Sequence, residues 1–83
     1  MDIITAHKFS SNHRESILKS KNCGCFYCLQ IFSSSEINDW CDEDKYNIGQ
    51  TAMCPKCGID SLIGDNDLYF DKLFLEEMHK YWF

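Results

Sequence analysis

The sequence predicts a small α+β domain organised around a metal site, and three observations support this fold class. The chain has 83 residues, fewer than a hydrophobic core alone usually stabilises well. It carries six cysteines, four of which form two Cys-x-x-Cys pairs. Its last segment, residues 71–83, has apolar residues at helical spacing. The ordinary hydrophobic and charged content, with a single proline, excludes a disordered tail or a low-complexity linker.

The first part of this single domain, residues 1–22, is expected to be an arm with one short helix. Residues 1–9 are mixed in polarity and fit either a short strand or a loose arm. A helix is predicted at about residues 12–20, because Asn12 followed by Glu15 forms a capping pattern at its start.

The second part, residues 23–64, contains both cysteine pairs and most of the predicted strands. A tight turn at the first pair leads into a strand, and residues 50–53 and 59–63 are predicted as strands around the second pair. Between the pairs, Ser33 and Glu36 form a capping box. Apolar residues then follow at helical spacing, which predicts a short helix at Ser34–Cys41 with Cys41 buried in its apolar face.

The third part, residues 65–83, is predicted as a turn followed by the clearest helix of the chain. Asp71 or Asp67 can cap the start of this helix, where a negative charge suits the helix dipole. We expect its apolar face to pack across the strands. That face is predicted to consist of Phe70, Leu73, Phe74, Met78, Tyr81 and Trp82.

The two cysteine pairs carry the strongest chemical signal in the sequence. Cys25 and Cys28 form the first pair, and Cys54 and Cys57 form the second after 25 intervening residues. A two-residue spacing lets both sulfurs of a pair point at one ion, and the Pro and Gly of the second pair suit a tight loop. The pattern predicts one structural Zn²⁺ on these four thiolates, a closed tetrahedral site with no open position for a substrate.

Several alternatives stay open at this point. Iron uses the same four sulfurs, and Cys23 could replace Cys25 as the partner of Cys28 through a wider loop. Cys23 could otherwise be a free or reactive thiol. The three histidines have no ligand-spaced partner, so each is expected to be a surface or packing residue. They are His7, His13 and His79.

No known catalytic motif appears in the sequence, so an enzyme is not expected. A four-cysteine site also leaves no coordination position for Lewis-acid chemistry. No apolar run approaches the ~20 residues that cross a bilayer, and the start lacks the features of a signal peptide. A cytoplasmic location is therefore expected, where paired cysteines indicate metal ligands more often than disulfides.

The net charge of −5 disfavours non-specific nucleic-acid binding, which needs an excess of Lys and Arg. The charge is also unevenly distributed along the sequence. Residues 1–22 carry +2 and residues 23–83 carry −7. An acidic surface of this kind suits solubility or a basic partner.

Around both pairs the chain resembles small bacterial cytoplasmic zinc-ribbon proteins. The resemblance rests on Cys-Phe-Tyr-Cys at residues 25–28 and on Cys-Pro-Lys-Cys-Gly-Ile-Asp-Ser at residues 54–61, and extends over residues 23–83. More loosely, it reaches the zinc-ribbon and treble-clef superfamily. It implies zinc on the four paired cysteines, a bacterial or phage source and no known catalysis. The predicted helix between the pairs departs from a minimal zinc ribbon, which leaves ribbon and treble clef both open.

These features favour a structural zinc-binding protein that acts as a protein-interaction module, such as an adaptor, an inhibitor or an immunity-type partner. The aromatic end, residues 81–83, supplies residue types common at interfaces. The alternative is a nucleic-acid-binding zinc ribbon, such as a transcription-associated factor, with a basic edge formed by Lys8, Arg14, Lys19 and Lys21. A third hypothesis is a redox or zinc-responsive switch through Cys23 and Cys41. The oligomeric state is not indicated.

Overall fold

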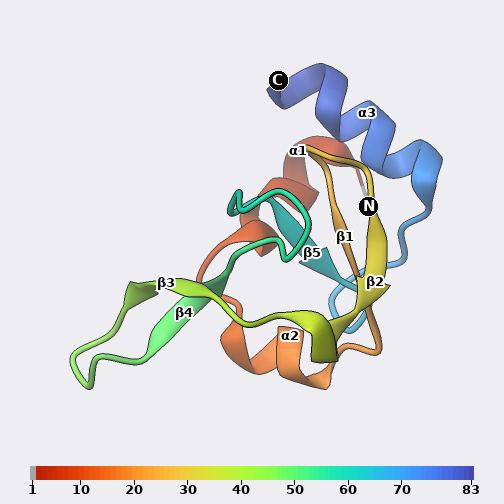
Figure 1. Ribbon diagram of the computed structural model, residues 1–83. Coiled ribbons are helices and arrows are strands. Elements are labelled where there is room, and N and C mark those ends of the chain that lie inside the picture. The colour runs from red at the N-terminus through yellow and green to blue at the C-terminus, as the bar shows by residue number, and fades with distance from the viewer. Residues whose placement is uncertain (1) are drawn as a thin grey trace.

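Two small antiparallel sheets form the β part of the computed structural model, which describes residues 2–83 (Figure 1). The first sheet has the strand order β2-β1-β5, so β1 is central. The second pairs β3 with β4 in a hairpin that projects from the rest of the structure (Figure 1). The strands are β1 (Asn22–Cys25), β2 (Ile31–Ser33), β3 (Trp40–Glu43), β4 (Gly49–Ala52) and β5 (Leu62–Gly64).

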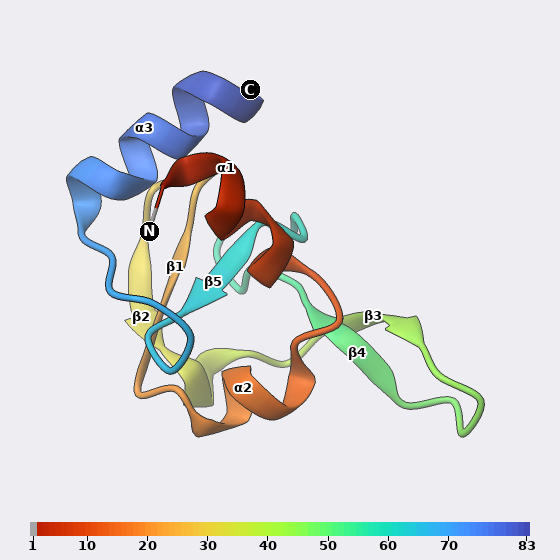
Figure 2. The ribbon, with the colours of Figure 1, turned by 180° about the vertical axis from the view of Figure 1, so that it is seen from behind.

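Helices cover both ends of the three-stranded sheet. Figure 2 shows α1 and α3 at one end and α2 at the other. Together with the two sheets, they confirm the predicted α+β class. None of the helices in residues 2–83 combines the length and apolarity needed to cross a membrane. The helices are α1 (Ile3–Ala6), η1 (His7–Ser10, 3₁₀), α2 (Arg14–Lys19), η2 (Ser34–Glu36, 3₁₀) and α3 (Lys72–Trp82).

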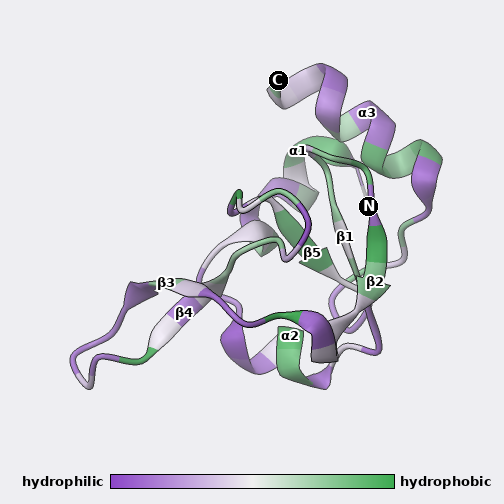
Figure 3. Ribbon diagram, in the orientation of Figure 1, coloured by the Kyte–Doolittle hydropathy of each residue, from purple (hydrophilic) through white to green (hydrophobic). Residues whose placement is uncertain are grey.

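Apolar residues lie along the strands of the three-stranded sheet, whereas the loop of the β3–β4 hairpin is mostly polar (Figure 3). Successive residues of a strand point to opposite faces, so the two faces of this sheet support two separate clusters. One cluster packs under α1 and α3, and the other includes Ile17 of α2 and two of the paired cysteines, Cys25 and Cys54. On the α3 side, Gly24 permits a close approach. A β-carbon at Gly24 would lie 2.6 Å from the Phe70 ring and 2.9 Å from a Leu75 methyl group.

The C-terminal helix forms where the sequence predicts it, and Asp71 caps it by accepting a hydrogen bond from the Phe74 N–H at 2.9 Å. The predicted apolar face was partly wrong. Leu75 and Met78 are fully buried, whereas Leu73 is 70% exposed. Tyr81 also lies mostly in solvent. The buried side of the helix is therefore rotated from the predicted one.

The helix predicted at Ser34–Cys41 is wrong beyond its first turn. The capping box between Ser33 and Glu36 is present, but it starts only the 3₁₀ turn η2. Trp40 then begins β3 and pairs with Ala52, and the Arg14 guanidinium lies 4.5 Å from the centre of the Trp40 ring. Pairing with β4 and this cation–π contact take precedence over the local helical spacing.

The N-terminal part also differs from its prediction. Residues 3–10 form α1 and η1 rather than a strand or a loose arm, and Asp2 caps α1 by accepting from the Thr5 N–H at 2.7 Å. The predicted helix near residues 12–20 is present as α2. Asn12 does not cap it, because Asn12 lies in the left-handed region at φ 49° and donates its N–H to Thr51 Oγ1.

His13 is a buried connector between the N-terminal part and β4. Its Nε2 accepts a hydrogen bond from the Ala52 N–H at 3.0 Å. Because that nitrogen is an acceptor, Nδ1 carries the proton and donates to the Phe9 carbonyl oxygen at 2.5 Å. The contact to Ala52 needs the neutral ring, because protonation of Nε2 would break it, whereas the contact to Phe9 persists in either state.

We expect the stability of the protein to fall as the pH drops below about 6.5, the ordinary pKa of histidine. Burial lowers the pKa of His13, and the Phe9 hydrogen bond and the charge of Asp67 offset only part of this effect. The unfolded chain therefore takes up a proton at a higher pH than the folded chain. Stability is complete above about 6.5 and declines toward the lowered pKa of the folded state.

Urea unfolding in excess zinc between pH 8 and pH 5.5 measures this slope. The His13→Gln variant lacks the titrating ring, so its slope should be shallower, and it should lose about 1–3 kcal/mol at pH 8 through buried groups left unpaired. Acid also weakens metal binding, but that contribution is shared by both proteins. Parallel slopes for the two proteins would contradict this role of His13.

Candidate metal centre

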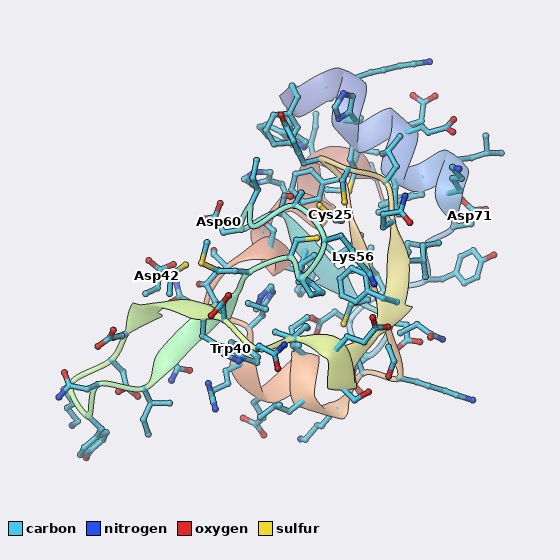
Figure 4. The ribbon with its side chains drawn as sticks, in the orientation of Figure 1. Cys25, Trp40, Asp42, Lys56, Asp60 and Asp71 are labelled. Carbon is cyan, nitrogen blue, oxygen red and sulfur yellow. The ribbon has the colours of Figure 1, made fainter. Side chains whose placement is uncertain are left out.

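Four cysteine sulfurs converge between the two loops that carry the Cys-x-x-Cys pairs. Cys25 ends β1 and Cys28 lies in the following turn, whereas Cys54 and Cys57 lie between β4 and β5. All four Sγ atoms lie within 4.8 Å of one another. Figure 4 labels Cys25, one of the four. The structure thus brings together the four residues that the sequence predicts as ligands.

The spacing of the sulfurs fits a tetrahedral metal site. Cys25 Sγ lies 3.7 Å from Cys57 Sγ, and Cys28 Sγ lies 3.7 Å from Cys54 Sγ. A tetrahedral Zn²⁺ with zinc–sulfur bonds of about 2.3 Å places its sulfurs about 3.8 Å apart. The donor set and its separations therefore suit one Zn²⁺, and the same sulfurs suit iron.

The two loops share one backbone conformation. In the first loop, the Cys25 N–H donates to the Gln30 carbonyl at 3.0 Å, and the Leu29 N–H donates to the Cys25 carbonyl at 2.8 Å. In the second loop, the corresponding bonds join Cys54 with Ile59 at 2.9 Å and Gly58 with Cys54 at 2.9 Å. Each loop is therefore closed by its own backbone, which holds its two sulfurs on one side.

The residue after the second cysteine takes a left-handed conformation in both loops. Leu29 has φ 66° and Gly58 has φ 79°. Glycine reaches this region without strain, whereas a residue with a β-carbon does not. Leu29 is partly buried against the cluster beneath α1 and α3, so its packing offsets the strain in the first loop.

Replacing Gly58 with Ala should destabilise the zinc-loaded protein by about 1–2 kcal/mol through backbone strain alone. A β-carbon there meets no other atom within 4 Å, so no steric clash contributes. Urea unfolding measures the loss. Gly58→Asn is the matched comparison, because asparagine tolerates this region better and should lose less. Equal losses for the two variants would contradict the conformational explanation.

Cys25 is the most strongly hydrogen-bonded of the four sulfurs. It is fully buried, and the Ser61 hydroxyl lies 3.0 Å from its Sγ. The N–H groups of Tyr27 and Cys28 each donate to the same sulfur at 3.4 Å. Burial opposes ionisation, but these three donors outweigh it, and the pKa of Cys25 is lowered. The loop thus favours the thiolate that binds a metal ion.

Cys28 and Cys57 depend more on a bound cation to ionise. Burial raises the pKa of Cys28 and of Cys57, and each has one backbone donor, from Gln30 and from Ile59 respectively. The nearby sulfurs raise both pKa values further. A divalent metal supplies the positive charge that stabilises four adjacent thiolates. Cys28 and Cys57 are also partly exposed, so they form the solvent side of the site.

The remaining two cysteines lie outside the cluster. Cys23 is fully buried on β1, and burial together with the charge of Asp65 raises its pKa to about 12. Among the described residues, the cluster that could hold a metal ion contains Cys25 and not Cys23. Cys41 is half-buried on β3 rather than a fully buried core thiol, which corrects the sequence prediction. Its pKa is raised by burial and by the charges of Asp42 and Asp60.

The histidines have packing roles. Among the described residues, the cluster that could hold a metal ion contains no histidine. The His7 ring lies 4.0 Å from the Trp82 ring, centre to centre. His79 places its Nδ1 3.1 Å from the Phe26 carbonyl oxygen. Together with buried His13, these contacts support the expected packing or surface roles.

Ser61 is the site residue that sequence reasoning missed. It lies four residues after Cys57 and is 2% exposed, and its backbone carbonyl accepts from the Phe26 N–H at 3.0 Å. This contact ties the second loop to the first and brings the Ser61 hydroxyl to Cys25. The sequence contains no local signal for this role, because it depends on a contact between residues 36 positions apart.

Comparisons with known protein families, with curated protein sequences and with solved structures found no match for this chain.

Proposed function

We propose that this chain is a structural zinc protein whose folded surface binds another protein. The observation that carries the proposal is the convergence of four cysteine sulfurs within 4.8 Å, at separations that suit a closed tetrahedral site. Four thiolates fill the coordination of Zn²⁺, which supports a structural rather than a catalytic role. None of the six cysteines, all of them within the described residues, forms a disulfide, which fits a reducing compartment such as the cytoplasm. We also propose that the chain is related to the small bacterial zinc-ribbon proteins that its cysteine motifs resemble.

An exposed aromatic surface supports the choice of a protein partner. We call it the C-terminal aromatic surface, and it consists of Tyr27, Tyr81, Trp82 and Phe83. These side chains are 36–58% exposed. Tyr27 meets Phe83 edge-on with ring centres 4.9 Å apart, and Tyr81 meets Trp82 edge-on at 4.7 Å. Aromatic residues are enriched among those that anchor protein interfaces, and here four of them are exposed and pack in pairs.

The charges support a protein partner over nucleic acid. Two members of the predicted basic edge already have partners within the chain. Arg14 donates to the Gly49 carbonyl at 2.9 Å, and Lys19 lies 3.0 Å from Glu15 in an ion pair. The net charge is −5, so few free cations remain to bind phosphates.

Two measurements test the proposal. Metal analysis of the purified protein should find one zinc per chain, and iron in that position would overturn the choice of metal. The zinc-loaded protein, immobilised and exposed to a lysate of the source organism, should then retain a specific protein. The double variant Tyr81→Ala/Phe83→Ala should lose that protein while keeping its zinc. Retention of nucleic acid in a salt-dependent manner, with no protein retained, would overturn the function.

A further inference from the structure

A small pocket opens beside the C-terminal aromatic surface. Its volume is about 180 Å³, and it lies between η1, the loop after Cys57 and the C-terminal end of the chain. Three aromatic residues line it, His7, Phe26 and Phe83, together with the acidic residue Asp60. The pocket is below the size of sites for drug-sized ligands, about 300–1,000 Å³, but has room for the end of one long side chain.

The rings of this pocket are held in place by one another. The Phe26 ring lies 5.8 Å from His7 and 5.9 Å from Phe83, centre to centre. The Trp82 ring also lies against His7, with ring centres 4.0 Å apart, and Phe26 itself is almost fully buried. The faces of aromatic rings carry partial negative charge, so a wall of this kind attracts a cation.

Asp60 is held at the pocket by the loop of the metal centre. Its neighbour Ser61 is fixed by the contacts to Phe26 and Cys25. Asp60 itself is exposed and lies on the outer side of this loop (Figure 4). Within residues 2–83 its carboxylate forms no hydrogen bond or ion pair. An unpaired carboxylate beside an aromatic wall is the chemistry that recognises a positively charged side chain.

We propose that this pocket receives an arginine or lysine side chain from a basic segment of a partner protein. The inference rests on the proposed function and specifies its partner. Long-range charge favours the same partner, because residues 23–83 carry −7. The cation would meet the Asp60 carboxylate while its stem packs on Phe83, and the remaining C-terminal aromatic surface would contact the neighbouring residues of the partner.

The test uses the zinc-loaded full chain and two short peptides, acetyl-Gly-Arg-Gly-amide and the same peptide with Gln in place of Arg. In an NMR titration at low ionic strength, the Arg peptide should shift the amide signals of Ser61 and Phe83, and the Gln peptide should not. Asp60→Asn should weaken binding of the Arg peptide about fivefold. Phe83→Leu, which keeps an apolar side chain but removes the ring, should weaken it about threefold.

Glu43→Gln is the matched control, because it removes the same charge from the distant β3–β4 hairpin. It should leave binding unchanged within twofold. Equal binding of the two peptides, or equal weakening by Asp60→Asn and Glu43→Gln, would contradict the proposed binding of a cationic side chain in this pocket. Zinc content is measured on every variant. A protein that keeps one zinc but does not bind the Arg peptide contradicts only the proposed cation binding in the pocket. A wild-type chain without zinc contradicts the proposed function.

Discussion

Replacing Cys54 with Ser, or removing the metal with a chelator, is expected to unfold the protein at 25 °C. A structural Zn²⁺ in a site of this kind contributes on the order of 10 kcal/mol to folding. The entire stability of a small domain is only about 5–15 kcal/mol, and a chain of 83 residues lies near the lower end. Loss of the site therefore removes most of the free energy that keeps the chain folded.

The reason is visible in how the two halves of the structure meet. Cys25, Cys28, Cys54 and Cys57 come from two loops that are separated by 25 residues, and Cys25 and Cys54 are buried in the core cluster on the α2 side. Without a cation, four thiol groups occupy this place with only weak hydrogen bonds between them. A bound metal ion would join the two loops through four metal–sulfur bonds, and the surrounding strands would then pack.

Circular dichroism and metal analysis on the same samples measure the effect, and Cys41→Ser provides the control. Cys41 is half-buried and lies outside the sulfur cluster, so the identical substitution there should keep one zinc per chain and cost less than about 1 kcal/mol. An unchanged circular dichroism spectrum after complete removal of the metal would contradict the structural role of the site.

Features that depend on nearby residues could be predicted from the sequence. Cys-x-x-Cys spacing constrains two sulfurs within one turn, and both turns formed with closely matched backbone bonds. The C-terminal helix depends on a cap and on local spacing, and Asp71 provides that cap. The capping box at Ser33 also formed. In each case the interaction that decides the structure lies within five residues along the chain.

Apart from the convergence of the two cysteine pairs, features that depend on distant residues could not be predicted. The helix expected at Ser34–Cys41 gave way to β3, because Cys41 pairs with Thr51 across the hairpin. The central position of β1 follows from its pairing with β5, about 40 residues later, and the sequence contains no sign of this partner. The roles of His13 and Ser61 likewise depend on contacts 39 and 36 residues away. A pattern of polarity records that a residue is buried but not which residue it meets.

Replacing Leu75 with Ala is expected to cost about 2–5 kcal/mol, the second largest effect of a single substitution considered for this protein. Leu75 is fully buried, and its methyl groups would lie within 3.1 Å of a β-carbon at Gly24. Truncation leaves a cavity between α3 and β1. Because the chain forms two separate core clusters, few neighbouring side chains can move to fill that space.

Leu73→Ala is the matched comparison, since it removes the same atoms from the same helix. Leu73 is 70% exposed, so the loss should stay within about 0.5 kcal/mol when both variants are unfolded with urea in excess zinc. The two positions lie about 200° apart around the helix axis, so only one of them can face the sheet. A large loss at Leu73 and a small one at Leu75 would mean that α3 presents the face expected from its sequence. The predicted order of the two losses therefore fixes the rotation of α3 on the sheet, and with it the exposed side that carries Tyr81.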